Sequence, residues 1–394
     1  MPATRPIYLD HHATTPVDPR VVEQMLPYFT EHFGNAASRQ HAFGWKADEA
    51  VERARHQVAR LIGARAKEVV FTSGATEANT LAIRGALAAR HEHGAHVVTV
   101  ATEHKVVLDV CHTVAADGGR VTIVPVERDG RVDPVRVAAA IAPDTVLVSV
   151  MTANNEIGVI HPVSEVSTVC RARGVWLHTD GVQAAGHVPF DVEALGVDLA
   201  SFSAHKMYGP KGVGALYVRR APKVTIVPQT VGGGQEQGLR AGTLNVPGIV
   251  GFGAAAAIAR DLIATEGPRV AALRDRLLAG LTRALEAVTV NGSRSARLPH
   301  NLHVSFAGVD GEALMTGLAD HVAVSSGSAC ASGSREPSHV MTALGAGAVE
   351  RWGALRFGLG RGTTAADIDA AVTHVAACVT RLRAMSPVGV GGSQ

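Results

Sequence analysis

The segment LASFSAHKMYGPKGVGALYV, residues 199–218, contains the pattern from which the fold can be predicted. Two apolar runs typical of β-strands, residues 199–204 and 213–218, flank a Gly/Pro-rich turn that carries His205 and Lys206. Similar runs alternate with apolar helical segments over the preceding part of the chain. This alternation predicts an α/β fold, in which helices cover both faces of a mainly parallel sheet.

The other elements are read outward from this segment. A helix is predicted over DEAVERARHQVARLIG, residues 48–63, because its apolar residues recur at helical spacing and Gly63 supplies a stop. Further strands are predicted at KEVVFT (67–72), HVVTVA (96–101), VTIVPV (121–126), TVLVSVM (145–151) and VWLHTD (175–180). After about residue 250 the chain is Ala-rich and helical to about residue 287, and then helices alternate with the strand-like pieces NLHVSF (301–306), VAVSS (322–326) and ALRFGLG (354–360).

These elements indicate two domains. We expect a large domain with the mainly parallel sheet over residues 15–260. A smaller α+β domain is expected from residues 1–14 and 261–385, followed by a flexible tail of small residues, 386–394.

Composition narrows the class of protein. The 394 residues are 46% hydrophobic and 18% charged, and 37 Lys and Arg against 35 Asp and Glu give a formal net charge of +2. This balance argues against a nucleic-acid or membrane surface and favours a small-molecule substrate. The N-terminus lacks a signal-peptide core, and the longest near-apolar stretch, Gly248 to Ala259, is shorter than the roughly 20 residues of a membrane span. We therefore expect a cytoplasmic protein.

Polar residues follow the predicted strands at their carboxyl ends. Ligands of open α/β sheets bind beyond these ends, so we expect the residues to converge on one pocket. They are Ser73 to Thr76, Glu103 and His104, Asn154 and Asn155, Asp180, and His205 and Lys206.

Each of these features has a plainer alternative. Ser73-Gly74-Ala75-Thr76 before a helix forms a phosphate cradle, or else Ser73 or Thr76 is an ordinary N-cap. Lys206 is one of only six lysines and could form a Schiff base, or it is a solvated charge. Asp180 could pair with a protonated ring nitrogen of a cofactor, or it is a helix N-cap. His104 could stack on such a ring or move protons, or it is exposed.

The cysteines divide into two kinds. Cys111, Cys170 and Cys378 lie in or beside apolar segments and are expected to be small core residues. Cys330 lies instead in SSGSACASGS, residues 325–334, a run of small residues with little to pack. Such a loop could bring a thiolate to a substrate and then to another protein, although an incidental exposed thiol is the alternative.

Taken together, the motifs resemble the cysteine desulfurases of the NifS/IscS type, within the class V aminotransferase group. The resemblance extends from YLDHHATTPVDPRV (8–21) to LRFGLGRGTT (355–364), nearly the whole chain. It includes FTSGATEAN (71–79), TEHKVVL (102–108), MTANNEIG (151–158), HTDGVQAAG (178–186), SAHKMYGPKGVGALYV (203–218), GGGQEQGLRAGTLN (232–245) and SSGSACASG (325–333). It implies the type I fold of transferases that depend on pyridoxal 5'-phosphate (PLP).

The resemblance also implies roles for individual residues. Lys206 would bind PLP covalently and remove the Cα proton of the substrate, His104 would stack on the ring and help to move protons, and Cys330 would be the nucleophile. The remaining contacts would be Asp180 to the ring nitrogen, Gln183 to the ring hydroxyl, Ala75, Thr76, Ser203 and His205 to the phosphate, Thr243 to the phosphate from the partner subunit of a homodimer, and Asn155 and Arg356 to the cofactor and the substrate carboxylate.

The implied reaction converts L-cysteine to L-alanine and leaves the sulfur as a persulfide on Cys330, for transfer to an acceptor protein in iron-sulfur cluster assembly or another pathway. A selenocysteine lyase, another class V aminotransferase or lyase, and a non-catalytic homologue are the alternatives. No metal site is expected, because the adjacent His11 and His12 on an extended segment point apart. The sequence departs from the family pattern at Gly353-Ala354-Leu355-Arg356, which weakens serine-based contacts but keeps the arginine. It also ends soon after Arg383, without the longer C-terminal extension that some members use to dock a scaffold, which leaves the acceptor open.

Overall fold

The computed structural model describes residues 5–326, 338–347 and 353–385, so Cys330 and the predicted tail lie outside the described residues. Its largest sheet has seven strands in the order β2-β8-β7-β6-β5-β3-β4. Every neighbouring pair is parallel except those of β8, which runs antiparallel to both β2 and β7. The strands are β2 (Val69–Thr72), β3 (His96–Val100), β4 (Arg120–Val124), β5 (Thr145–Ser149), β6 (Trp176–Asp180), β7 (Leu199–Ser203) and β8 (Gly214–Val218). The predicted α/β fold and its strands are confirmed.

Helices cover both faces of this sheet, because successive strand residues point to opposite sides. Val97 of β3 and Leu147 of β5 pack into one core, whereas their neighbours Val98 and Val148 pack into another on the opposite face. The first face is covered by α4 (Ala75–Ala89) and α5 (Lys105–Ala116). The second is covered by α3 (Ala42–Leu61), α6 (Pro134–Ala140), α7 (Val163–Ala172), α8 (Val192–Leu195) and α9 (Val246–Ala284).

The first long helix, α3, starts earlier than predicted. It begins at Ala42 rather than near residue 48, because the ring of His41 caps it by accepting a hydrogen bond from the backbone N–H of Gly44 at 3.3 Å. Gly44 and Phe43 in this first turn hid the helical pattern. Two short helices, α1 (Pro19–Met25) and α2 (Pro27–Thr30), precede it.

A second core is built on smaller sheets. The antiparallel sheet has the order β12-β10-β9, and β1 and β11 form a parallel pair. The predicted strand VAVSS is shorter than expected: Val322–Ala323 form the strand, and Ser325 adds only an isolated antiparallel bridge to Arg356. The elements are β1 (Ile7–Tyr8), β9 (Val288–Val290), β10 (Asn301–Phe306), β11 (Val322–Ala323), β12 (Ala354–Gly358), α10 (Gly311–Leu318), α11 (His339–Ala343) and α13 (Ala365–Met385).

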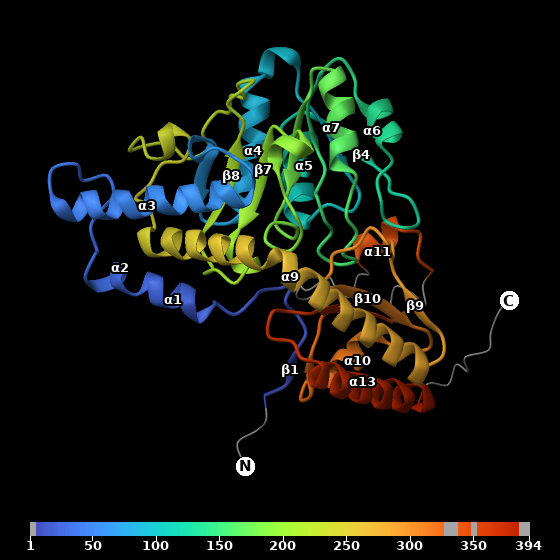
Figure 1. The fold of residues 1–394 in the computed structure, drawn as a ribbon. Coiled ribbons are helices and arrows are strands. Elements are labelled where there is room, and N and C mark those ends of the chain that lie inside the picture. The colour runs from blue at the N-terminus through green and yellow to red at the C-terminus, as the bar shows by residue number, and fades with distance from the viewer. Residues whose placement is uncertain (1–4, 327–337, 348–352, 386–394) are drawn as a thin grey trace.

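Helix α9 joins the two cores, as its course in Figure 1 shows. Ala254 near its start packs into the core of the large sheet, and Leu277 and Leu281 near its end pack into the second core. Among the described residues it is the helix long and apolar enough, by length and composition alone, to cross a membrane. However, 61% of its most apolar window is buried within the protein, as in the core helix of a soluble protein.

Candidate active site

His104 shows that the strand ends converge. It follows β3 and caps α5, where its Nδ1 accepts a hydrogen bond from the backbone N–H of Val106 at 3.2 Å. Burial lowers the pKa of His104, and of the nearby charges Asp180 raises it while Lys206 lowers it. Residues after β3, β6 and β7 therefore lie within electrostatic reach of one another, as the strand-end argument predicts.

Lys206 is held by the N-terminal segment. It ends a short 3₁₀ helix, η3 (Ala204–Lys206), directly after β7. Its Nζ donates to the carbonyl oxygens of Ala13, at 2.7 Å, and of His12. The alternative of a freely solvated surface charge is therefore wrong, because the amine is fixed by backbone acceptors.

Asp180 is a buried carboxylate at the end of β6, with 5% of its surface exposed. Its Oδ2 accepts from the side-chain amide of Asn79 at 2.8 Å and its Oδ1 from the backbone N–H of Val182 at 3.0 Å. The helix N-cap alternative is wrong, since a turn follows Asp180 and the next helix begins only at Val192. No described cationic side chain forms an ion pair with Asp180, so the site favours a positively charged ligand group.

The start of α4 is open. Gly74 is the N-cap and no side chain caps the helix, so the predicted alternative with Ser73 or Thr76 as the cap is wrong. A Cβ built on Gly74 would meet no atom within 4 Å. The first amides of α4, which include those of Ala75 and Thr76, can therefore be approached by an anion.

Two further residues of the predicted phosphate site lie nearby in the chain. Ser203 ends β7 and is buried, and the ring of His205 hydrogen-bonds to Thr14 Oγ1 at 3.1 Å. Burial, with the positive charges of Lys206 and Lys211, lowers the pKa of His205 to about 4, so its ring is neutral at neutral pH.

Arg356 and Asn155 meet in the structure, although not through the side chain of Asn155. Arg356 lies on β12, where its Nη1 donates to the backbone oxygen of Asn155 at 2.9 Å. Its Nη2 donates to Asp10 Oδ1 at 2.8 Å. The guanidinium is therefore placed where the N-terminal segment, the second core and the loop after β5 meet.

Two predicted residues are not brought to this site. Thr243 is exposed in the loop before α9, and within this single chain no hydrogen bond joins it to the described site residues. Cys330 lies outside the described residues. The other three cysteines, Cys111, Cys170 and Cys378, are buried as predicted, and burial raises the pKa of Cys111 and of Cys170 to about 12.

The sequence argument gave no role in the site to Asn79 or His12, and it named Glu103 only as a polar residue at a strand end. Asn79 lies on the first turns of α4 and holds Asp180. Glu103 is fully buried, and burial together with Asp180 raises its pKa well above the usual value. His12, considered only as a metal ligand, contacts Gln183 instead, whereas His11 contacts the carbonyl oxygen of Gly358. The position of Asn79 in the motif FTSGATEAN was the available signal for that residue.

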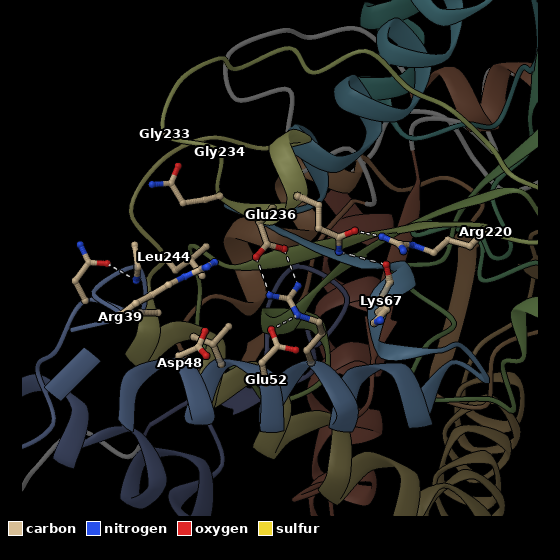
Figure 2. Close-up of a pocket in the computed structure, with 16 residues that line it drawn as sticks. Arg39, Asp48, Glu52, Lys67, Arg220, Gly233, Gly234, Glu236 and Leu244 are labelled. Atoms are coloured by element: carbon tan, nitrogen blue, oxygen red, sulfur yellow. Dashed lines mark hydrogen bonds and ion pairs between the residues drawn. The ribbon is translucent and has the colours of Figure 1, made fainter. Parts of the chain in front are cut away.

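A large cavity of about 870 Å³ lies elsewhere, between α3 and the loop that contains Gly233, Gly234 and Glu236. Figure 2 shows Glu236 reaching from this loop toward the helix that carries Glu52. Neither Lys206 nor Asp180 lines the cavity.

Comparisons with known proteins show which family the chain resembles in sequence and fold. Residues 7–371 match the family described as aminotransferase class-V. A cysteine desulfurase IscS from Anaeromyxobacter sp. (strain Fw109-5) is 59% identical over 383 residues, which cover 97% of this chain and 95% of the relative. The IscS of Methylococcus capsulatus is 53% identical over 97% of this chain and 94% of its own length.

A solved structure described as a NifS-like protein superposes with a TM-score of 0.89 at 35% identity, and covers 96% of this chain and 100% of that structure. Fold and sequence thus agree over nearly the whole length. The chain belongs to the class-V aminotransferase family, among the cysteine desulfurases of the NifS/IscS type.

Proposed function

We propose that this protein is a PLP-dependent cysteine desulfurase, which removes the sulfur of L-cysteine and leaves L-alanine. The observation that carries the proposal is the convergence of Lys206, Asp180 and His104 at one edge of the sheet. Full-length similarity to cysteine desulfurases supports it. These relatives do not favour the alternative of a selenocysteine lyase or another class V enzyme.

The described residues suit both the ring and the phosphate of PLP. The buried carboxylate of Asp180, which forms no ion pair with a described side chain, suits the protonated ring nitrogen, and the open amino end of α4 suits the phosphate. Lys206 would bind the cofactor covalently. The other contacts we propose are His104 and Gln183 to the ring, Asn155 to its orientation, and Ala75, Thr76, Ser203 and His205 to the phosphate. When bound, PLP supplies an electron sink for the substrate carbon skeleton.

The side chains of the protein donate and accept the protons that the reaction moves. Because Nδ1 of His104 accepts from Val106, the neutral ring carries its proton on Nε2, where it can donate. The amine of Lys206 takes up and returns the Cα proton. Asn79 fixes the carboxylate of Asp180, so that this charge would already face the ring nitrogen and the side chain need not move during the reaction.

Substrate binding and sulfur transfer fall to two further residues. Arg356 would bind the carboxylate of L-cysteine, a bidentate task that suits a guanidinium group. The Cys330 thiolate would attack the substrate sulfur, so that a new S–S bond forms as the C–S bond breaks. L-cysteine and the Cys330 thiol thus become L-alanine and a persulfide, with no external oxidant. The role of Cys330 rests on its sequence motif.

We further propose a cytoplasmic homodimer in which Thr243 contacts the phosphate of the partner subunit's site. The exposure of Thr243 in the single chain and its place in the motif GGGQEQGLRAGTLN support this arrangement. A sulfur-acceptor protein would then discharge the persulfide.

The test is an assay of the purified protein with L-cysteine and a thiol reductant, in which alanine and sulfide are measured together. Equal amounts of both products are expected, and Cys330→Ala should abolish both while the yellow colour of bound PLP remains. Cys170→Ala is the matched control, because Cys170 is buried in α7 and should leave the product ratio unchanged. Sulfide production that does not depend on Cys330 would contradict the assignment.

A further inference from the structure

Four buried side chains form a hydrogen-bonded series that ends at Gln183. Arg297 Nη1 donates to Asn301 Oδ1 at 2.8 Å, and Asn301 Nδ2 lies 3.1 Å from His12 Nε2. His12 Nδ1 lies 2.8 Å from Gln183 Oε1. All four residues are buried, so no solvent competes for these hydrogen bonds. The series brings together the loop before β10, the start of β10, the N-terminal segment and the turn after β6.

Donor and acceptor chemistry gives this series one direction. Arginine can only donate, so Asn301 must present its oxygen to Arg297 and its nitrogen to His12. The second hydrogen of that nitrogen is taken by the backbone oxygen of Glu156 at 2.9 Å, which supports the same orientation. His12 therefore accepts at Nε2 and carries its proton on Nδ1, from which it donates to Gln183.

The amide of Gln183 is fixed in turn. Its oxygen accepts from His12, and its nitrogen donates to the backbone oxygen of the same residue at 3.2 Å. A flipped amide would set two donors against each other at Nδ1 and two acceptors at the carbonyl oxygen. Among the described residues none accepts the second hydrogen of Gln183 Nε2, so the amide retains one N–H for a ligand.

The backbone makes room for this arrangement at two glycines. At Gly158, whose φ is +69°, a Cβ would lie 2.3 Å from Asn301 Cγ. At Gly358 a Cβ would lie 2.9 Å from His12 Cδ2. The ring of His12 also stacks on that of His300, with ring centroids 4.4 Å apart.

The surroundings keep His12 neutral. Burial lowers its pKa well below the usual value, and the charges or partial charges of Arg356, His187 and Lys206 lower it further, against the opposing hydrogen bond to Gln183. A neutral ring has one donor and one acceptor, which is the condition that the directed series requires.

We propose that His12 is a positioning residue, which holds Gln183 so that its amide N–H, and not its oxygen, is presented to the ring oxygen of bound PLP. The proposal rests on the proposed function in that it assumes PLP as the ligand. A donor there stabilises negative charge on the ring oxygen, and an amide oxygen in its place would repel that charge.

The pH dependence of the visible absorbance of the PLP-loaded enzyme reports this contact. Loss of the donor makes the ring oxygen more basic, so that the chromophore holds its proton to higher pH. His12→Phe keeps an aromatic ring that can stack on His300 and the backbone oxygen that accepts from Lys206, but it removes both ring nitrogens. We expect it to raise the midpoint of the absorbance titration by about one pH unit.

Two variants serve as matched comparisons. His12→Asn restores a side-chain donor and should return the midpoint toward the wild-type value. His300→Phe alters the other ring of the stack, which has no hydrogen bond to Gln183, and should leave the midpoint unchanged. His12→Phe should also cause no additional shift in a Gln183→Leu background, because both changes remove the same contact. A wild-type midpoint in His12→Phe, or a shift that persists in Gln183→Leu, would overturn the proposal.

The ring tautomer provides a test that needs neither catalytic activity nor bound PLP. In the wild-type apoprotein with ¹⁵N-labelled histidine, the His12 signal, assigned by its loss in His12→Asn, should show a protonated Nδ1 and an unprotonated Nε2. A proton on Nε2 of His12 would contradict the proposal. Failure of the protein to act on L-cysteine would leave this measurement intact, so the two proposals fail separately.

Discussion

Replacement of Arg55 by methionine should destabilise the protein by about 3–5 kcal/mol, because it leaves a buried carboxylate without its cation. Arg55 Nη1 and Nη2 contact the two carboxylate oxygens of Glu236 at 2.7 and 2.8 Å, and the side chains are only 7% and 1% exposed. Glu236 Oε2 also accepts from the backbone N–H of Phe71 at 2.6 Å. After the substitution this backbone donor alone would remain to hold the charge.

The structure allows the charge to be separated from the other losses. Arg55→Met also removes a donor to the oxygen of Val69, at 2.9 Å, and a cation–π contact with Phe71, with 4.8 Å to the ring centroid. The double variant with Glu236→Gln keeps an acceptor for Phe71 N–H but removes the uncompensated charge. It should therefore recover all but about 1–2 kcal/mol of the loss.

The assay is urea unfolding of the apoprotein, followed by circular dichroism. Arg276→Met is the control, because its ion pair with Asp369 is exposed and should not contribute measurably. A loss below about 1 kcal/mol in Arg55→Met, or a double variant no more stable than the single one, would refute the argument that an uncompensated buried charge dominates.

Three other substitutions test the site and the core. Lys206→Ala should abolish the covalent attachment of PLP, seen as the loss of a borohydride-trapped protein adduct; an adduct of undiminished yield would place the attachment elsewhere. Asn79→Ala should lower kcat/KM for L-cysteine about 10- to 100-fold by removing a hydrogen bond to the charged Asp180, and unchanged kinetics would show that this contact is not used. Burial lowers the pKa of His178 to about 3, below the roughly 6.5 of an unfolded chain, so the unfolded state takes up the proton first and stability falls by about 1.4 kcal/mol per unit as the pH drops below about 6.5. His178→Gln should remove this part of the slope, which urea midpoints at about pH 7 and about pH 5 will show.

Apolar periodicity predicted the sheet and the place of the site, because both follow from local patterns. A strand that is buried on both faces appears in the sequence as a run of mainly apolar residues. Asp180 ends one such run, and Lys206 follows shortly after another. Their meeting at one edge follows from the parallel pairing. The family motifs then supplied the chemistry that single residues left open.

The contacts that the sequence did not predict are those between distant segments. Asn79 and Asp180 are 101 positions apart, and His12 and Gln183 are 171 apart. No local pattern marks such pairs, since each side chain alone is an ordinary polar residue. The cap of α4 was missed for a different reason: Gly74 caps through its backbone, whereas the sequence argument looked for a hydroxyl at Ser73 or Thr76.

The segment before α9 contacts α3 and the start of α4, where we propose that the phosphate binds, through two ion pairs. Glu236 is held by Arg55 of α3, and Arg240 Nε contacts Glu77 Oε1 of α4 at 2.7 Å. Glu77 lies in the first turn of α4, where its negative charge would oppose a bound phosphate. Burial raises the pKa of Glu77, but the hydrogen bonds from Arg240 and from Ser73 outweigh this effect and lower it, so the group stays charged and is neutralised by Arg240. Because the same segment continues to Thr243, any shift of Glu236 in the Arg55 variant would displace both the neutralising arginine and the residue that we propose contacts the partner subunit.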